Sequence, residues 1–232
     1  SYYGNTKLYY SNGNLAAKFY NVEGGLVIAY IEGDICFYYE NGKLAFKGSV
    51  EEYHYGDKHI VYGNDLNWYY NNGKLAAKTV GGEDGVDLAN GPFSIYYENG
   101  NLAIQGEFYE ASWRGGEWKW YYENGNLSLK EVYTQDYKNE IDNGVTYFEN
   151  GQVELIFSYH YDNPGLEFGN WKCYDETGSL KWQKTFESDE NEEIICSGDC
   201  DKKVKVPYYK MKDFYQPEII FPFKKFDKLV SK

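Results

Sequence analysis

Tyr38-Tyr39-Glu40-Asn41-Gly42-Lys43-Leu44 decides the fold, because Asn-Gly between β-prone residues is the strongest short signal for a β-hairpin. Nearly identical stretches occur at residues 96–102 and 121–127, and four looser copies complete the set. The expected repeat turns lie at Gly13, Gly42, Gly73, Gly100, Gly125, Gly151 and Gly178. These glycines are 29, 31, 27, 25, 26 and 27 residues apart, which indicates seven tandem repeats.

A second glycine precedes the turn glycine by nine residues in five copies: Gly4, Gly33, Gly91, Gly116 and Gly169. The third copy has Gly63 ten residues before its turn, and the sixth has Gly144 only seven before. The consensus is Gly-x-apolar-x-apolar-Tyr-Tyr-x-Asn-Gly-x-Leu.

The turn type predicts which residues face one another. A type I′ turn needs positive φ at both central residues, so we expect a two-residue loop of Asn41 and Gly42. Glu40 then faces Lys43, Tyr39 faces Leu44, Tyr38 faces Ala45 and Phe37 faces Phe46.

Alternation along the strands then separates two faces. The expected core face collects Ile35, Phe37, Tyr39, Leu44 and Phe46 in the second copy, and Trp118, Trp120, Tyr122, Leu127 and Leu129 in the fifth. The other face takes the first tyrosine of each pair, with a small residue opposite. These tyrosines are the candidate binding face: Tyr9, Tyr38, Tyr69, Tyr96, Tyr121, Tyr147 and Tyr174.

The composition supports an all-β protein. The 232 residues include 27 Tyr, 13 Phe and 6 Trp, which favour strands, and 25 Gly, which favour tight turns. We therefore predict an all-β fold, an elongated single antiparallel sheet of about fourteen strands from seven tandem hairpins. No apolar run approaches the roughly 20 residues of a membrane helix, so no membrane span is expected.

The Tyr-Tyr-x-Asn-Gly-x-Leu cassette resembles the MORN repeat, specifically its bacterial variant form, which also defines a group of toxin–antitoxin antidotes, the YwqK family. The resemblance covers about residues 4–186. It implies successive hairpins joined into one twisted sheet that acts as a binding platform. Eukaryotic MORN repeats also occur beside lipid-kinase domains, but the roughly 46 residues after Phe186 are too short for a kinase domain, and no phosphate-binding Gly-rich loop is evident.

The chain changes character after the last repeat, so we divide it into repeats at 1–186, an acidic linker with a Cys pair at 187–200, and a basic aromatic tail at 201–232. The linker begins with a charge run over residues 187–193, interpreted as a solvated linker or loop, with a cation or partner site as the alternative. The tail carries a net charge of +5 and contains Ile219-Ile220-Phe221 and Phe223. Because a repeat sheet needs its last edge covered, we expect this tail to be a C-terminal cap.

Cys196 and Cys200 are close enough in sequence for a disulfide, with plain thiols or half a metal site as the alternatives. A structural zinc site needs a second pair of ligands, and the sequence offers none, so we expect no metal and no cofactor. Cys36 and Cys173 lie at strand positions and are interpreted as small buried side chains.

Catalytic groups are scarce. His54 and His59 flank the longest interval between repeats, and His160 is distant from both in sequence. No Cys or Ser stands in a sequence motif typical of a catalytic nucleophile. No repeat is interrupted by a group of residues that could act together in catalysis. We therefore expect no catalytic residues and no enzyme activity, although a glycosidase-like pair of carboxylates is not excluded by counting.

Charge narrows the choice of partner. The formal net charge is −13, and the first 200 residues alone carry −18. This field disfavours nucleic acid and anionic lipid and favours a basic protein partner. The expected function is a protein-binding platform, an antitoxin-like masker of an effector by resemblance. The alternatives are an exported glycan-binding surface protein and a self-associating repeat protein that forms a homodimer. The chain begins at Ser1, so a cytoplasmic location and export after removal of a leader both stay open.

Overall fold

The computed structural model describes residues 2–25, 28–31, 33–54, 59–62, 65–80, 91–109, 113–133, 141–160, 163–188 and 194–198. The chain divides into two compact units, Ser1–Cys200 and Asp201–Lys232. All described residues belong to the first unit. The tail that we expect to cap the sheet lies outside the described residues, and the cap stays a prediction.

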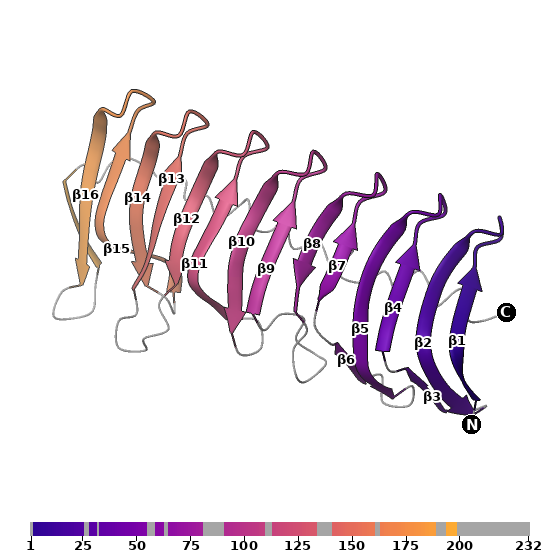
Figure 1. The fold of residues 1–232 in the computed structure, drawn as a ribbon. Coiled ribbons are helices and arrows are strands. Elements are labelled where there is room, and N and C mark those ends of the chain that lie inside the picture. Colours follow the sequence, from indigo (N-terminus) through magenta and orange to yellow (C-terminus); the bar gives the residue numbers. More distant parts are fainter. Residues whose placement is uncertain are drawn as a thin grey trace. The chain divides into compact units, whose positions relative to one another are not determined.

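All regular structure in the described residues is β-strand (Figure 1). The first half contains β1 (Tyr2–Tyr9), β2 (Leu15–Gly25), β3 (Ile28–Ile31), β4 (Gly33–Tyr38), β5 (Leu44–His54), β6 (His59–Tyr62), β7 (Leu66–Tyr69), β8 (Leu75–Thr79) and β9 (Gly91–Tyr96). The second half contains β10 (Leu102–Tyr109), β11 (Trp113–Tyr121), β12 (Leu127–Tyr133), β13 (Ile141–Tyr147), β14 (Val153–His160), β15 (Asn163–Tyr174), β16 (Leu180–Ser188) and β17 (Ile194–Gly198).

The strands form one open antiparallel sheet in chain order. Seven hairpins, from β1–β2 to β15–β16, pair internally and then pair with the next hairpin. The short strands β3 and β6 lie in line with β4 and β7, because β2 and β5 each pair with both members. The sheet is thus fifteen strands wide, which confirms the predicted fold class. Figure 1 shows the seven hairpin turns along one edge, here called the turn edge.

The turn type was predicted wrongly. In the second hairpin the Tyr39 amide donates to the Lys43 carbonyl (2.8 Å) and the Gly42 amide donates to the Tyr39 carbonyl (2.8 Å). The loop therefore has three residues, 40–42, and among these only Gly42 has a positive φ, of 82°. This is the hairpin loop that ends in a left-handed glycine and a bulge, and all seven hairpins share it.

The bulge shifts the register next to the turn. Tyr38 stands opposite Leu44 rather than Ala45, and Tyr39 closes the loop against Lys43 rather than facing Leu44. Farther from the turn, Phe37 pairs with Phe46 as predicted. The core assignment is confirmed for the buried Ile35, Phe37, Phe46, Trp118, Trp120 and Leu129. Tyr39, Leu44, Tyr122 and Leu127 are only half-buried.

One row of core residues crosses the whole sheet on this core face. Its members pair from strand to strand, and most are buried aromatic or aliphatic side chains. In chain order they are Leu8, Ala17, Phe37, Phe46, Trp68, Ala77, Ile95, Ile104, Trp120, Leu129, Thr146, Leu155, Cys173 and Trp182. Neighbouring rings touch within the row: the Phe46 and Trp68 centroids are 5.1 Å apart. Such cross-strand aromatic pairs stabilise the sheet.

Glycines beside this row give the largest rings room. A Cβ at Gly144 would lie 2.1 Å from Phe157 Cζ, and one at Gly106 would lie 2.1 Å from Trp118 Cδ2. The upstream glycine of the consensus therefore has two roles. In most described copies, such as Gly33, it has a positive φ, whereas Gly144 is needed for the space that the Phe157 ring fills.

The sheet continues past the expected end of the repeats. β16 extends to Ser188, and β17 pairs with it antiparallel, from Ser188 opposite Ile194 to Lys184 opposite Gly198. The segment expected as a linker, residues 187–200, therefore contributes strand residues at both ends of its acidic run. Residues 189–193 of that run lie outside the described residues.

Gly144→Ala is predicted to lower the free energy of unfolding by about 1–3 kcal/mol, because the fully buried Phe157 ring must move. Gly42→Asn is the control: no atom lies within 4 Å of its Cβ position and Asn tolerates a positive φ, so a loss of at most about 1 kcal/mol is expected. Urea unfolding of both variants measures the difference. Equal losses would contradict the packing role of Gly144.

Candidate binding face

The seven predicted tyrosines lie at equivalent places in the structure. Each is the last residue of the first strand of its hairpin, directly before the turn, and stands opposite the Leu or Val that follows the turn. Tyr9 is 55% exposed and the others are half-buried. We call Tyr9, Tyr38, Tyr69, Tyr96, Tyr121, Tyr147 and Tyr174 the tyrosine row.

A row rich in lysine runs beside the tyrosine row. Residues two apart on a strand share a face, so Lys7, Lys119 and Lys172 lie on the same face as Tyr9, Tyr121 and Tyr174. Following the strand pairing across the sheet from Lys7 to Gln183, seven of fourteen positions are lysine. The lysine row is Lys7, Lys18, Lys47, Lys78, Lys119, Lys130 and Lys172.

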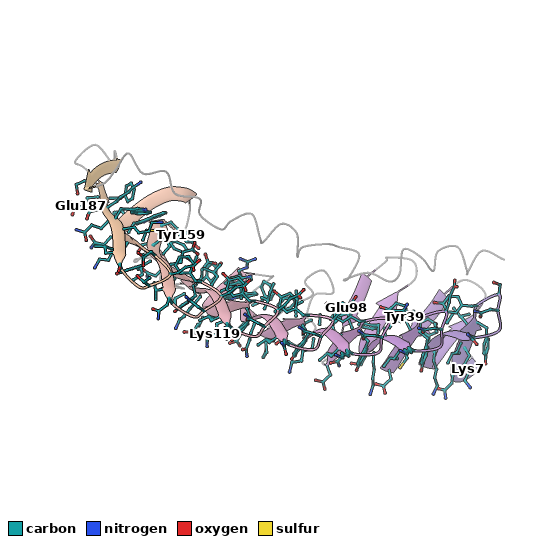
Figure 2. All side chains as sticks on the ribbon, turned by 90° about the horizontal axis from the view of Figure 1, so that it is seen from above. Lys7, Tyr39, Glu98, Lys119, Tyr159 and Glu187 are labelled. Atoms are coloured by element: carbon teal, nitrogen blue, oxygen red, sulfur yellow. The ribbon has the colours of Figure 1, made fainter. Side chains whose placement is uncertain are left out.

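The two faces of the sheet are distinct in Figure 2. Lys7 and Lys119 lie on the lower side in this view, whereas Tyr159, which is buried on the core face, lies on the upper side. The tyrosine row and the lysine row together form the face opposite the core, here called the tyrosine–lysine face. Sequence reasoning found the tyrosines but missed the lysines, although Lys stands three residues after the cassette leucine in four of the seven copies.

The lysines differ in how they are paired. Lys119 Nζ contacts Glu117 Oε1 at 2.5 Å, and Lys130 Nζ contacts Glu117 Oε2. These two hydrogen bonds lower the pKa of Glu117. Lys7, Lys47, Lys78 and Lys172 are exposed and make no ion pair within the described part of the chain.

The second tyrosine of the cassette connects neighbouring hairpins. The Tyr39 hydroxyl donates to the backbone carbonyl of Tyr69 (2.6 Å), and the Tyr97 hydroxyl donates to that of Tyr121 (2.6 Å). Tyr10, Tyr70 and Tyr122 do the same at 2.6–2.7 Å. Partial burial raises the pKa of all five phenols. These side chains therefore hold the tyrosine row in place. The prediction that Tyr39 and Tyr122 fill the core is wrong.

The turn asparagine has a role that the predicted turn did not require. Asn99 Oδ1 accepts from the Asn101 amide (2.8 Å), and its Nδ2 donates to the Glu123 carbonyl of the next turn (2.9 Å). Asn41 and Asn150 make the same two kinds of bond. The amide side chain thus braces its own turn and links it to the following one. The exposed Glu98 and Glu123 are the first residues of their three-residue loops.

A polar cluster lies within the core face at the fifth and sixth repeats. Tyr133 Oη donates to Glu131 Oε2 (2.6 Å) and accepts from Arg114 Nη1 (3.0 Å), and Tyr159 Oη donates to Glu131 Oε1 (3.5 Å). The Arg114 guanidinium also lies 5.0 Å from the Trp118 ring centroid. Burial, together with the charge of Glu131, raises the pKa of Tyr133.

This cluster interrupts the apolar core, and the sequence analysis did not identify it. Glu131 is 3% exposed and pairs between Trp118 and Gly144 on the core face. A buried carboxylate is costly unless it is paired. The hydroxyls of Tyr133 and Tyr159 donate to Glu131, and Arg114 in turn donates to Tyr133. The signal in the sequence that could have revealed this cluster is the carboxylate of Glu131 at a core-facing position of a predicted strand. The members bond to one another, so the cluster is a structural network.

The other candidate residues have different outcomes. The strand register sets His54 opposite His59, but the side chains of both lie outside the described part. Cys36 is a buried free thiol, as predicted, whereas the free Cys173 is only half-buried. Cys200 lies outside the described residues, so the disulfide to Cys196 stays a prediction. No group of three His, Cys, Asp or Glu side chains in the described ranges is arranged to hold a metal ion. Within the same ranges, no helix is long and apolar enough to cross a bilayer.

Comparison with known families matches three of the hairpins. The family model described as MORN repeat variant matches residues 31–54, 89–110 and 114–135. These ranges contain the hairpins β4–β5 and β9–β10, and the hairpin β11–β12 from Arg114 onward. These three hairpins are therefore MORN repeat variants, and such repeats generally mediate binding and are typically non-catalytic. None of the curated proteins compared with the chain matches it.

Tyr97→Phe is predicted to lower the free energy of unfolding by about 1 kcal/mol, because it removes the hydroxyl that bonds to the next hairpin. Tyr96→Phe is the matched control, since the acceptor at Tyr96 is its backbone carbonyl and survives the substitution. Urea unfolding at neutral pH compares the two. A loss in Tyr96→Phe as large as that in Tyr97→Phe would argue against the hydroxyl link.

Stability is predicted to fall as the pH rises above about 10. Unfolded tyrosine loses its proton near that pH, while folded Tyr133 keeps its own because its pKa is raised, so the folded state binds more protons there. In Tyr133→Phe the decline should be shallower by up to about 1.4 kcal/mol per pH unit. Urea unfolding between pH 8 and 11 measures both slopes. Identical slopes would show that Tyr133 does not contribute.

Proposed function

We propose that the protein is a non-catalytic binding platform whose protein partner docks on the tyrosine–lysine face. The observation that carries the proposal is the tyrosine row, seven phenol rings placed at one register by seven equivalent bulged turns. At about 4.8 Å per strand, a row over fourteen strands extends for roughly 60 Å. This length suits a large interface.

The chemistry of the row supports binding. Tyrosine is enriched among the residues that dominate interface energies, because a rigid amphipathic ring buries much area at low entropic cost. The backbone beneath the row is fixed by the hydroxyls of Tyr10, Tyr39, Tyr70, Tyr97 and Tyr122. A pre-ordered surface loses little entropy when a partner docks.

Two observations support a platform without enzyme activity. Repeats of this family are typically non-catalytic. In the described ranges, the one buried cluster of titratable side chains is the network around Glu131, whose members already bond to one another.

The partner is proposed to be a basic protein overall. A net charge of −18 over the first 200 residues steers a cationic protein toward the sheet, with an on-rate that falls as salt rises. The antidote-like role implied by the resemblance is one form of this function, in which the partner is a toxin or another effector. Glycan binding to the tyrosines and pairing of two copies are the rival functions.

Affinity capture from the native cell tests the proposal, with the triple variant Tyr69→Ala/Tyr96→Ala/Tyr121→Ala. We expect the wild type to retain a partner protein that the triple variant loses by more than about tenfold. Glu98→Ala/Glu123→Ala/Glu149→Ala, three exposed changes at the turn edge, is the matched control and should retain it. Melting temperatures verify that both variants fold.

Three results would contradict the proposal. The first is recovery of the protein alone together with sedimentation as a dimer. The second is capture that is unchanged in the tyrosine variant. The third is binding on a glycan array that depends on the same tyrosines, which would assign the face to carbohydrate.

A further inference from the structure

We infer that the lysine row over the first three hairpins binds an acidic segment of polypeptide in an extended conformation, with a carboxylate at about every third residue. The inference rests on the proposed function, because it specifies the segment that docks on the tyrosine–lysine face.

The lysines of these hairpins repeat with the cassette. Lys18, Lys47 and Lys78 each stand three residues after the cassette leucine, on β2, β5 and β8. Lys7 on β1 pairs directly with Lys18. Lys7, Lys47 and Lys78 are exposed, and no carboxylate in the described part forms an ion pair with them. This part of the row is therefore positively charged at its surface.

The spacing of the row matches an extended chain. Lys18, Lys47 and Lys78 lie on alternate strands of the sheet, so their backbone positions are about 9.6 Å apart. A polyproline II segment rises about 3.1 Å per residue with three residues per turn. Every third side chain then lies on one side at intervals of about 9.3 Å. Carboxylates at that interval meet successive lysines without a change of register.

The positive stripe is only one residue wide. Tyr38 and Tyr69 lie on its turn side, and the exposed Asp34, two residues before Cys36 on β4, lies on its other side. Cys36 pairs with both Lys18 and Lys47, and Asp34 stands two residues before Cys36, so this aspartate lies beside the two lysines. A bilayer or a duplex would meet Asp34 as well as the lysines. A single polypeptide laid along the stripe meets the lysines, while its intervening residues contact the tyrosines.

The net charge of the protein does not prevent this contact. At physiological ionic strength, charges more than about 8 Å away are largely screened, so the nearest lysines dominate the interaction of a docked carboxylate. The acidic body steers a partner that is basic overall. The lysine row then selects the segment of that partner that seats on the sheet.

Peptide binding to the full chain tests the inference. The probe is fluorescein-labelled (Glu-Pro-Ala)×5, and the comparison peptides are an isomer with all glutamates contiguous and the lysine analogue (Lys-Pro-Ala)×5. Fluorescence anisotropy should show that the periodic acidic peptide binds most tightly and weakens as salt rises. Lys47→Gln/Lys78→Gln should weaken it about 2- to 5-fold per lysine. Lys43→Gln/Lys74→Gln, two exposed lysines at the turns and outside the lysine row, is the matched control and should leave it unchanged.

Several outcomes overturn the inference. These are no binding of the periodic acidic peptide, equal binding of the contiguous isomer or the lysine analogue, and no effect of Lys47→Gln/Lys78→Gln. Tighter binding of a 15-nucleotide single-stranded DNA or of phosphatidylserine vesicles would assign the row to phosphate instead. Capture of a partner that depends on the tyrosines but not on Lys47 and Lys78 would remove the inference and leave the proposed function standing.

Discussion

The turn glycine, with φ near 82° at Gly42, fixes which residues of each hairpin stand opposite one another. A side chain at this position would strain the left-handed backbone, and a slip of one residue would exchange the two faces of the strand. Because seven turns share the same three-residue loop and bulge, seven hairpins share one register. The core row, the tyrosine row and the lysine row each run straight across the sheet as a result.

A second constraint on the core is that the largest aromatic rings need free space above the backbone of the neighbouring strand. Trp118 and Phe157 lie over Gly106 and Gly144, where a methyl group would overlap the ring atoms. A sheet in which every core position carried a large side chain could not bring these rings so close to the backbone. Where Glu131 takes such a position instead, Arg114, Tyr133 and Tyr159 gather around it. A core position of the repeat therefore accommodates a charged residue only where polar side chains replace the usual apolar neighbours.

Most of the fold could be predicted from the sequence, because the spacing of the cassette and its alternation report directly on hairpins and faces. The pairing of Phe37 with Phe46 followed from that alternation, and the bulge next to Tyr38 did not. Asn-Gly is compatible with both a two-residue and a three-residue loop, so the cassette alone did not decide between them. The tyrosines were evident because they recur in every copy. The lysines and Glu131 were missed because their grouping depends on pairing across strands distant in sequence.

The hydrogen bonds that side chains at the turns donate to the neighbouring turn run in one direction. Tyr10, Asn14 and Lys43 donate toward the following hairpin, and this series of phenols ends where Phe148 and then Asp175 replace tyrosine. Asp175 instead accepts the amides of its own turn, from Thr177 and Ser179. An array with such a polarity can gain or lose whole units internally, because each donor still meets an acceptor of the same kind. Copy number then acts as a molecular ruler: duplicating one unit would lengthen the surface by about 10 Å without redesigning any contact.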